Sequence, residues 1–477
     1  MKKIVISKLF LYKHRFVIGY ILLGLAFVGL LLGLPLVAQR GLSEAEMASS
    51  VNSYALSIDA PLNGDLVDLP YRVLQKLSIM IFGLTPYAIK LPSILIGLAL
   101  GLLLILLLNR WFKNNVSLLA SCLVVLSTPF LFLAGSGTPL IMIVFWPTLL
   151  LWLGSKIQGE KKPKPLYSFL FAIALLGAIF TPYMLYFAAF CVIFVCLQPH
   201  LRFIVKSLPR IPLIIVGLII VGGIVALAMN MISHPDTISE LLLAPGFEVS
   251  HFFENIWEGL RPVFGWREQP ESVFLAPLMS LPMLALALIG LFSTTKGFLA
   301  SRNSIASLLI IFTLVLAGLS PQAVIFFILP FAILIAHGLK YLLEKWYGLF
   351  PSNPYARVAA ILPLAILFGT ILIPSSLQYL YGYRYNPSIA SEFRYDLALI
   401  RENLSNQTLL VGENYDFYKL LEHSTDITVV NSLNDANGDL AVLYSEATSE
   451  KYALSRIITS PMRENSDIIY LYTEKGE

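Results

Sequence analysis

Residues 91–108 read LPSILIGLALGLLLILLL and contain no charged side chain. A run of this length and composition is typical of a helix that crosses a bilayer. The whole chain has the same character, since 57% of its 477 residues are hydrophobic and only 13% are charged, against about 25% charged in soluble proteins. The sequence therefore predicts a multi-span α-helical membrane protein. A net charge of +4 in such a chain does not indicate a nucleic-acid partner.

Similar apolar runs recur between charged or Gly-, Pro- and Asn-rich breaks. They give eleven candidate spans, at residues 17–37, 91–108, 116–134, 139–156, 166–182, 183–197, 210–231, 273–293, 304–318, 321–338 and 357–375. The pair 166–182 and 183–197 is joined only by Thr181-Pro182-Tyr183 and can also be one broken helix. With eleven spans, 19 Lys and Arg residues fall in the loops on the N-terminal side and six in the opposite loops. This bias predicts a cytoplasmic N-terminus and an outer C-terminus.

Three parts fall outside these spans, namely two outer loops at 39–90 and 232–272 and the tail 376–477. The tail has β-rich runs at 408–412, 427–430, 440–444 and 468–472, with helical stretches near 388–403 and 415–423. This alternation predicts a small α/β domain with a partly parallel sheet. We therefore expect a transmembrane module at 1–375 and an extracytoplasmic α/β domain at 376–477, for which the sequence indicates no catalytic role.

Two carboxylates follow the first span, in the stretch Gly41-Leu42-Ser43-Glu44-Ala45-Glu46-Met47-Ala48. The predicted spans themselves are almost free of acidic residues. A carboxylate at the water side of a lipid-facing site can take a proton from a hydroxyl or hold a cation against a phosphate. The alternative is a helix N-terminus at which Ser43 caps and the two Glu side chains complement the dipole.

The stretch from Leu69-Pro70 to Gly83 has helical spacing of its apolar residues and predicts an amphipathic helix in the membrane interface. Arg72 and Lys76 lie four residues apart on it, and Lys90 precedes the second span. All three depart from the charge bias of the loops, so they are candidates for binding a lipid phosphate. The alternative is ordinary anchoring at the interface.

The order of these elements resembles that of the integral-membrane GT-C glycosyltransferases, in particular the protein O-mannosyltransferases and the aminoarabinose-type lipid A transferases. The resemblance rests on the acids after the first span, Leu69-Pro70, Phe82-Gly83 and the stretch Ala88-Ile89-Lys90-Leu91-Pro92-Ser93. Pro321 to Pro330 near the penultimate span adds to it. It implies an inverting transfer of a hexose or pentose from a polyprenyl-phosphate donor to a lipid, glycan or protein acceptor. The expected place is the outer face of the plasma membrane, with Glu44 as general base. Glu46 stands where the family often has a basic residue, and it is a second catalytic candidate from the acidic stretch alone.

The chain departs from the family pattern at two positions. The family usually has an Asp-Glu pair where this chain has Ser43 and Glu44, and it commonly has an Asp where Leu140 stands. Three explanations are open at this stage. Another outer acid substitutes, with Asp65, Asp68, Asp236 and Glu240 as candidates, or one carboxylate suffices, or the chain is inactive.

Asp68, Asp236 and Trp257 are the candidates for binding the acceptor or the sugar, because sugars bond to carboxylates and stack on indole rings. For Trp257 the alternative is an aromatic anchor on an interfacial helix. A divalent cation is a candidate cofactor, although His234 and Asp236 have no evident third metal ligand.

Two other classes of function compete with the glycosyltransferase. A non-catalytic GT-C-like scaffold of a cell-envelope complex fits the missing Asp at Leu140. A lipid or saccharide transporter fits less well, since the spans lack intramembrane charge and show no clear repeat. The sequence has no Walker loop, which disfavours a nucleotide-driven pump.

Overall fold

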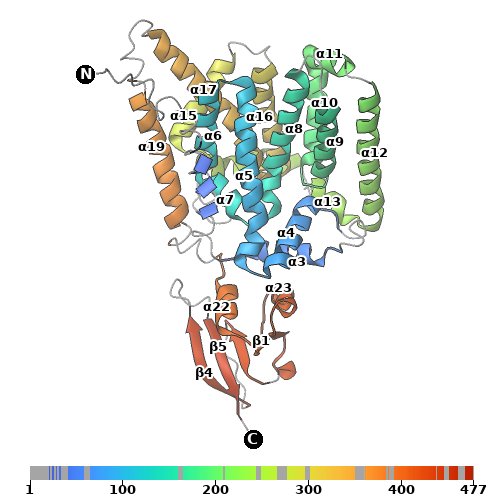
Figure 1. Ribbon diagram of the computed structural model, residues 1–477, viewed down its shortest axis with the longest axis vertical. Coiled ribbons are helices and arrows are strands. Elements are labelled where there is room, and N and C mark those ends of the chain that lie inside the picture. Colours follow the sequence, from blue (N-terminus) through green and yellow to red (C-terminus); the bar gives the residue numbers. More distant parts are fainter. Residues whose placement is uncertain are drawn as a thin grey trace, which may run out of the picture.

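Apolar helices form a bundle, and a small β-sheet lies beyond one end of it (Figure 1). The computed structural model describes residues 41–57, 65–159, 165–207, 210–242, 249–265, 277–295, 301–349, 361–382, 392–436, 438–444, 451–459 and 468–475, with isolated positions at 21–33, 359 and 385. The longer helices are α5 (Pro86–Trp111), α8 (Met142–Gly159), α12 (Arg210–Ser233), α16 (Ser301–Leu319), α17 (Ile328–Leu349) and α19 (Ile361–Leu377). The shorter ones are α6 (Asn114–Val125), α7 (Thr128–Gly135), α9 (Pro165–Ala178), α10 (Met184–Leu197), α11 (Pro199–Ser207) and α15 (Leu281–Thr295).

Several of these helices are suited to a bilayer. In the described part of the chain, five helical segments are long and apolar enough to cross a membrane, or up to seven if two bent pairs each form one span. Three more apolar helices are shorter, at Pro165–Ala178, Leu281–Thr295 and Asn303–Leu319. Most of the predicted first span, 17–37, lies outside the described residues. The described helices are those of an integral membrane protein. That the chain crosses the membrane eleven times stays a prediction.

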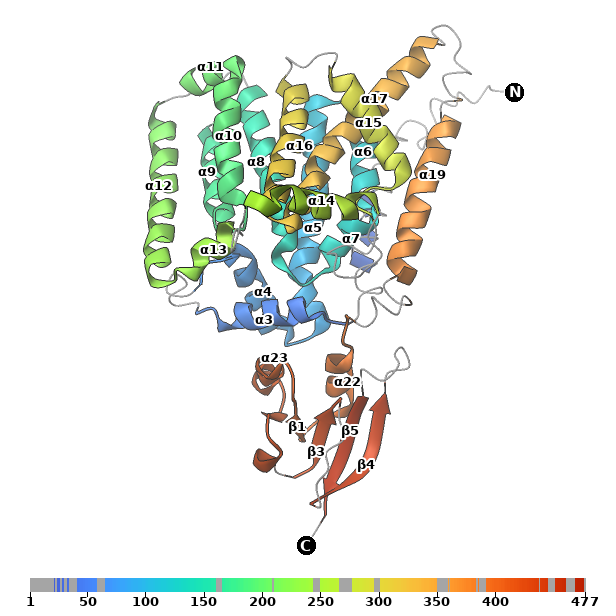
Figure 2. The ribbon, with the colours of Figure 1, turned by 180° about the vertical axis from the view of Figure 1, so that it is seen from behind.

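One predicted span looks different in the structure, whereas the pair predicted at 166–182 and 183–197 is observed as two helices. Residues 116–134, expected as one span, form α6 and α7 with a bend of 67° between them. The break follows from the sequence, because Ser127 is extended and Pro129 lies in the first turn of α7, where its missing N–H is tolerated. Residues 166–197 form two separate helices, α9 and α10, which run in opposite directions (Figure 2). Tyr183 reverses the chain with φ of 66° and donates its backbone N–H to Leu241 O at 3.1 Å.

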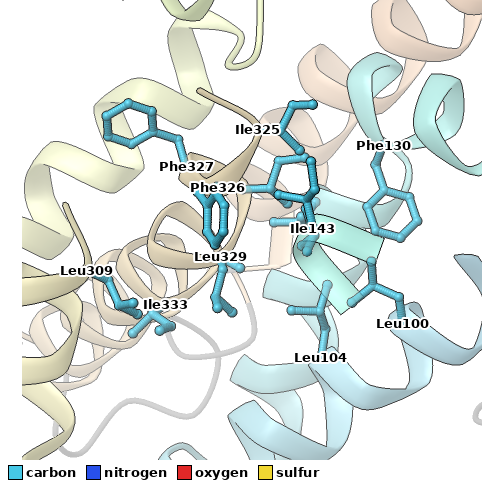
Figure 3. Packing of buried hydrophobic residues seen from close by; sticks show 14 of the residues in the cluster. Leu100, Leu104, Phe130, Ile143, Leu309, Ile325, Phe326, Phe327, Leu329 and Ile333 are labelled. Atoms are coloured by element: carbon cyan, nitrogen blue, oxygen red, sulfur yellow. The ribbon is translucent and has the colours of Figure 1, made fainter. Parts of the chain in front are cut away.

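The centre of the bundle is the segment formed by η4 (Pro321–Phe327) and α17. Phe326 and Ile333 of this segment belong to one buried cluster with Leu104 of α5 and Ile143 of α8, and Figure 3 labels all four. These side chains are 0–3% exposed, so the segment is held by close apolar packing on several helices. It coincides with the predicted span 321–338.

α15 and α17 approach so closely that their contact requires glycine. A Cβ on Gly338 would lie 2.1 Å from Leu286 O, whereas a Cβ on Gly348 of the same helix would meet nothing within 4 Å. We therefore expect Gly338→Ala to destabilise the protein by roughly 2 kcal/mol, because the clash is with backbone and the helices must separate. Gly348→Ala is the matched control and should leave the thermal unfolding midpoint unchanged. Equal midpoints for the two variants would contradict this account.

The C-terminal sheet has five strands in the order β2-β1-β3-β5-β4. They are β1 (Thr408–Leu410), β2 (Thr428–Val430), β3 (Leu440–Leu443), β4 (Tyr452–Thr459) and β5 (Ile468–Glu474). β1 pairs in parallel with β2 and β3, while β5 is antiparallel to β3 and β4. β1, β2 and β3 lie in the predicted runs, and β5 extends two residues beyond the run 468–472. The sequence did not predict β4, an edge strand whose middle residues are exposed and lack the apolar pattern of a buried strand.

Helices of the C-terminal part join the sheet to the bundle. α23 (Tyr415–Lys419) lies in the predicted stretch 415–423. The helix expected at 388–403 is observed only as α22 (Asp396–Asn403). Residues 388–391 lie outside the described part, and the prediction is wrong at Arg394, which instead forms an antiparallel bridge with Leu42. Leu397, Ile400 and Phe417 share a buried apolar cluster with Leu42 and Met47, so this part of the chain is seated on the end of the bundle.

Candidate functional site

The acidic stretch after the first predicted span forms the start of a helix, α3 (Glu44–Ala55). Ser43 Oγ accepts a hydrogen bond from the Glu46 N–H at 3.3 Å, and Glu46 Oε2 accepts one from the Ser43 N–H at 2.9 Å. This reciprocal arrangement is a capping box, and it satisfies two backbone donors. The alternative offered by the sequence, that Ser43 caps a helix, is confirmed, and both Glu side chains lie in the first turn.

Glu46 is buried and connects three segments of the chain. Its Oε1 accepts the Gly137 N–H at 2.6 Å, and its Oε2 lies 3.4 Å from Lys90 Nζ. Lys90 in turn donates to Gly41 O at 2.6 Å. The side chains of Glu46 and Lys90 are only 1% and 2% exposed. A predicted catalytic acid and a predicted phosphate-binding cation are therefore paired with each other, away from solvent.

Glu44 has the opposite environment. Its side chain is 72% exposed, and its Oε1 accepts a hydrogen bond from Arg394 Nη2 at 3.1 Å. Of the two predicted catalytic acids, Glu44 is thus the one that a substrate can reach. Arg394 was not predicted, because 350 positions separate it from Glu44 and no local pattern marks it.

Gln75 is a second residue that the sequence did not single out. It lies on α4 (Leu69–Phe82), the helix predicted at the interface, and is fully buried. Its amide nitrogen donates to Gly137 O at 2.8 Å and Ile89 O at 3.1 Å, and its amide oxygen accepts from Ser53 Oγ at 2.7 Å. Gln75 and Glu46 therefore hold the turn at Gly137 from both sides. The available signal was an amide side chain on the same helix face as the apolar residues Tyr71 and Ile79.

The other predicted phosphate-binding cations border the C-terminal end of α3. Arg72 donates to Asn52 O at 2.7 Å and forms an ion pair with Asp65 Oδ2 at 2.7 Å. Lys76 donates to Tyr54 O at 2.8 Å and also to Leu56 O. Cations at this end of a helix satisfy its last carbonyls and complement its dipole. The sequence predicted that both side chains face the headgroups, but each one is bonded to backbone carbonyl oxygens. A phosphate would have to compete with these carbonyls for the two cations.

Asp68 immediately precedes α4 and has a left-handed backbone with φ of 54°. Burial raises the pKa of Asp68 to about 8, although Arg72 acts in the opposite direction. Asp65 and Glu240 add to the rise. Glu240 lies on α13 (Asp236–Leu242), and its pKa is raised by partial burial and by Asp65 and Asp236. The four acids that the sequence offered as substitutes thus influence one another electrostatically.

Asp68→Asn is expected to stabilise the protein at alkaline pH. Since the pKa of Asp68 is raised from 3.8 to about 8, the stability contributed by its neutral form is complete below about pH 4 and is lost as the pH rises through about 8. Asparagine stays neutral and tolerates the left-handed backbone. The thermal unfolding midpoint of the variant should match the wild type at pH 4 and exceed it at pH 9, by on the order of 2 kcal/mol in stability. Exposed Asp236→Asn is the control, and the same pH dependence in Asp68→Asn and wild type would contradict the assignment.

Trp257 lies on α14 (Phe252–Phe264), apart from these residues. Figure 2 shows α14 crossing the bundle at a different level from α3 and α4. The indole is 50% exposed, and the Arg261 guanidinium lies 6.0 Å from the ring centroid. Asp236 is exposed at the start of α13, which lies near the end of the bundle where α3 and α4 are found (Figure 2). The structure therefore places Asp68 and Asp236 on the side of α3 and places Trp257 elsewhere.

Leu140 stands in the short helix η2 (Pro139–Ile141), just after the turn that Glu46 and Gln75 hold. It is partly buried and packs against the core of the bundle. The segment that carries the second acid in the resembling family is thus close to the N-terminus of α3, but its side chain here is apolar. Among the described residues, no group of three His, Cys, Asp or Glu side chains could hold a metal ion.

Residues 70–226 match the model of the family described as dolichyl-phosphate-mannose-protein mannosyltransferase. The structure of ArnT from Cupriavidus metallidurans bound to undecaprenyl phosphate is similar, with a TM-score of 0.57 and 11% identity, over 95% of this chain and 98% of that one. The oligosaccharyltransferase of Archaeoglobus fulgidus, tethered with an acceptor peptide, has a TM-score of 0.56 and 12% identity over 89% of this chain and 65% of that one.

The structure of the archaeal oligosaccharyltransferase AglB from Archaeoglobus fulgidus, in complex with an inhibitory peptide and a dolichol-phosphate, has a TM-score of 0.54 and 11% identity over 91% of this chain and 70% of that one. No curated protein matches the sequence significantly. ArnT and AglB are GT-C glycosyltransferases. Together, the family match and these likenesses confirm the resemblance predicted from the sequence: the chain has the fold of the GT-C integral-membrane glycosyltransferases.

Proposed function

We propose that this chain transfers a sugar from a polyprenyl-phosphate donor to an acceptor at the membrane face where α3 and α4 lie. The observation that carries the proposal is the environment of Glu44. It is an exposed carboxylate in the first turn of α3, on a segment that Glu46 and Gln75 fix against α5 and the turn at Gly137. A carboxylate that is exposed to solvent, on a segment that is held in place at the membrane face, is suited to act as a general base.

In the proposed reaction, Glu44 takes the proton from the acceptor hydroxyl or amine. The acceptor atom forms a bond to the anomeric carbon while the bond from that carbon to the phosphate oxygen breaks. The electron pair leaves with polyprenyl phosphate, and the configuration of the sugar is inverted. Glu46 supports this step through its contacts with Ser43 and Lys90 and, being buried, does not meet the acceptor.

Lys76 is the strongest of the three proposed phosphate-binding residues. Its partners are the neutral carbonyls of Tyr54 and Leu56 and the Tyr54 ring, and it has no ion pair in the described part of the chain. Arg72 and Lys90 are each paired with a carboxylate. A cation without a counter-ion gains most from a phosphate. Asp68, Asp236 and Trp257 stay the proposed contacts for sugar or acceptor.

The lipid donor is supported by the structural neighbours. The ArnT structure is bound to undecaprenyl phosphate, and the AglB structure holds a dolichol-phosphate. We infer the same class of carrier here, with the N-terminus in the cytoplasm and the site on the outer face of the plasma membrane. The acceptor is a lipid, glycan or protein of the envelope. A divalent cation is a candidate cofactor, and a reaction that stops with EDTA and resumes with Mg²⁺ or Mn²⁺ would establish it.

The test is release of polyprenyl phosphate by the purified, reconstituted protein from a panel of undecaprenyl- and dolichyl-phosphate hexoses and pentoses, supplied with mixed envelope acceptors. Release from at least one donor is expected. If a folded sample released no polyprenyl phosphate from any donor of the panel, the proposal would be overturned. The same result would favour the non-catalytic scaffold, for which the specific observations are the apolar Leu140 and the burial of Glu46.

A further inference from the structure

The C-terminal part of the chain reaches the N-terminus of α3 through Arg394. Its backbone pairs with Leu42 in both directions, with Leu42 N to Arg394 O at 2.9 Å and Arg394 N to Leu42 O at 2.8 Å. Leu42 is itself fully buried. The position of Arg394 is therefore fixed by backbone hydrogen bonds two residues before Glu44, independently of its side chain.

The Arg394 side chain lies between two exposed carboxylates. Its Nη2 is 3.1 Å from Glu44 Oε1 and 2.9 Å from Glu413 Oε2. The guanidinium carbon lies 5.1 Å from the centroid of the Tyr444 ring. The Arg394 side chain is 17% exposed, while both carboxylates are 72% exposed. The cation is thus held in place by the C-terminal part, and its planar group is restrained by the ring and by Glu413.

Further contacts between the C-terminal part and the α3 end of the bundle stabilise this position of Arg394. Arg401 of α22 donates to Leu84 O at 2.8 Å, just before α5 begins. Leu397 and Phe417 pack in one buried cluster with Leu84 and Met47. The C-terminal part and the α3 end of the bundle share this apolar core, so Arg394 and Glu44 meet across a packed interface.

We propose that Arg394 is a positioning residue that holds Glu44 for the transfer, so that the C-terminal domain completes the active site. This inference rests on the proposed function. The guanidinium bonds Oε1 of Glu44, which fixes the rotamer of a long, exposed side chain that would otherwise sample many directions. The other oxygen, Oε2, is left to receive the proton of the acceptor. The sequence indicated no catalytic role for the tail. In this proposal the tail orients the general base and thereby affects the rate of transfer.

The test compares three variants with the wild type in proteoliposomes, using whichever undecaprenyl- or dolichyl-phosphate sugar of the panel the wild type consumes. Arg394→Gln removes the contact with Glu44 and should lower kcat about tenfold with little change in the KM for the donor. Arg394→Lys keeps one donor to Oε1 and should recover part of the loss. Glu413→Gln removes one negative charge beside Arg394 but keeps an oxygen that can accept its hydrogen bond, so it should retain most of the activity. Since the bridge to Leu42 uses backbone atoms, all three variants should unfold at the wild-type temperature.

Unchanged kcat in Arg394→Gln would overturn the inference while leaving the proposed function intact. Equal losses in Arg394→Gln and Glu413→Gln would also overturn it, because they would point to the general stability of the interface. A wild type that releases no polyprenyl phosphate would overturn the proposed function, and this inference with it. Should Arg394→Gln fail to fold, Arg394→Lys carries the test. Glu44→Asp gives a second measurement, because the shorter side chain withdraws from Arg394. Wild-type kcat and KM in Glu44→Asp would count against positioning.

Discussion

Glu44→Gln is expected to lower the rate of donor turnover by about 10²-fold or more, because an amide cannot take the proton that the acceptor loses. The substitution keeps the size of the side chain and its place in the first turn of α3. It also keeps an oxygen that can accept the hydrogen bond from Arg394, so folding should be unaffected. The measurement is the initial rate of polyprenyl phosphate release at saturating donor.

Glu413→Gln is a closely matched control for this variant. Glu413 is exposed to the same extent as Glu44 and shares its Arg394 partner, but it belongs to the C-terminal part. It should keep the rate within a few fold. If Glu44→Gln turned over the donor as fast as Glu413→Gln, then Glu44 would not be the general base, and a different carboxylate such as Asp68 would have to be considered.

Glu46→Gln is expected to destabilise the protein by about 3 kcal/mol, because it leaves the buried charge of Lys90 without its counter-ion. The variant also weakens the bond to the Gly137 N–H, which loosens the turn before η2. Thermal unfolding in detergent measures the effect. Glu44→Gln, two residues away and exposed, is the control and should unfold like the wild type.

The double variant Glu46→Gln with Lys90→Met separates charge burial from loss of packing. Removing both charges should restore a substantial part of the stability lost in Glu46→Gln, since an apolar chain of similar length replaces the lone cation. A double variant whose loss of stability equals the sum of the losses in the two single variants would show that Lys90 stabilises the fold through Gly41 O and not through Glu46.

Local patterns in the sequence predicted local structure well. The apolar runs correspond to α5, α8, α12 and the η4–α17 segment, and the spacing at 69–83 corresponds to α4 with Gly83 at its end. The sequence also indicated Ser43 as a helix cap, while the reciprocal bond from the Ser43 N–H to Glu46 was found only in the structure. These features depend on residues that are near one another in the chain, so periodicity and capping rules apply directly.

Contacts between distant segments could not be predicted from those rules. Glu46 meets Gly137 across 91 positions, and Arg394 meets Glu44 across 350. Which of two acids in the same stretch faces solvent depends on these contacts. The acidic stretch in the sequence pointed to Glu44 and Glu46 together, and only the structure separated the exposed carboxylate from the buried one. Lys90 was likewise expected to be a phosphate-binding cation just before the second span, and it is enclosed by Glu46 and Gly41.

The most direct test of the proposed function follows both parts of a doubly labelled donor, with one label in the sugar and one in the phosphate, in sealed proteoliposomes. The account predicts that the protein forms one polyprenyl phosphate for each sugar that reaches the acceptor, with the phosphate label kept in the lipid. Movement of the intact donor across the bilayer without cleavage would indicate a transporter. Transfer of the phosphate label to the acceptor together with the sugar would also contradict the account, because it would mean that a different bond breaks.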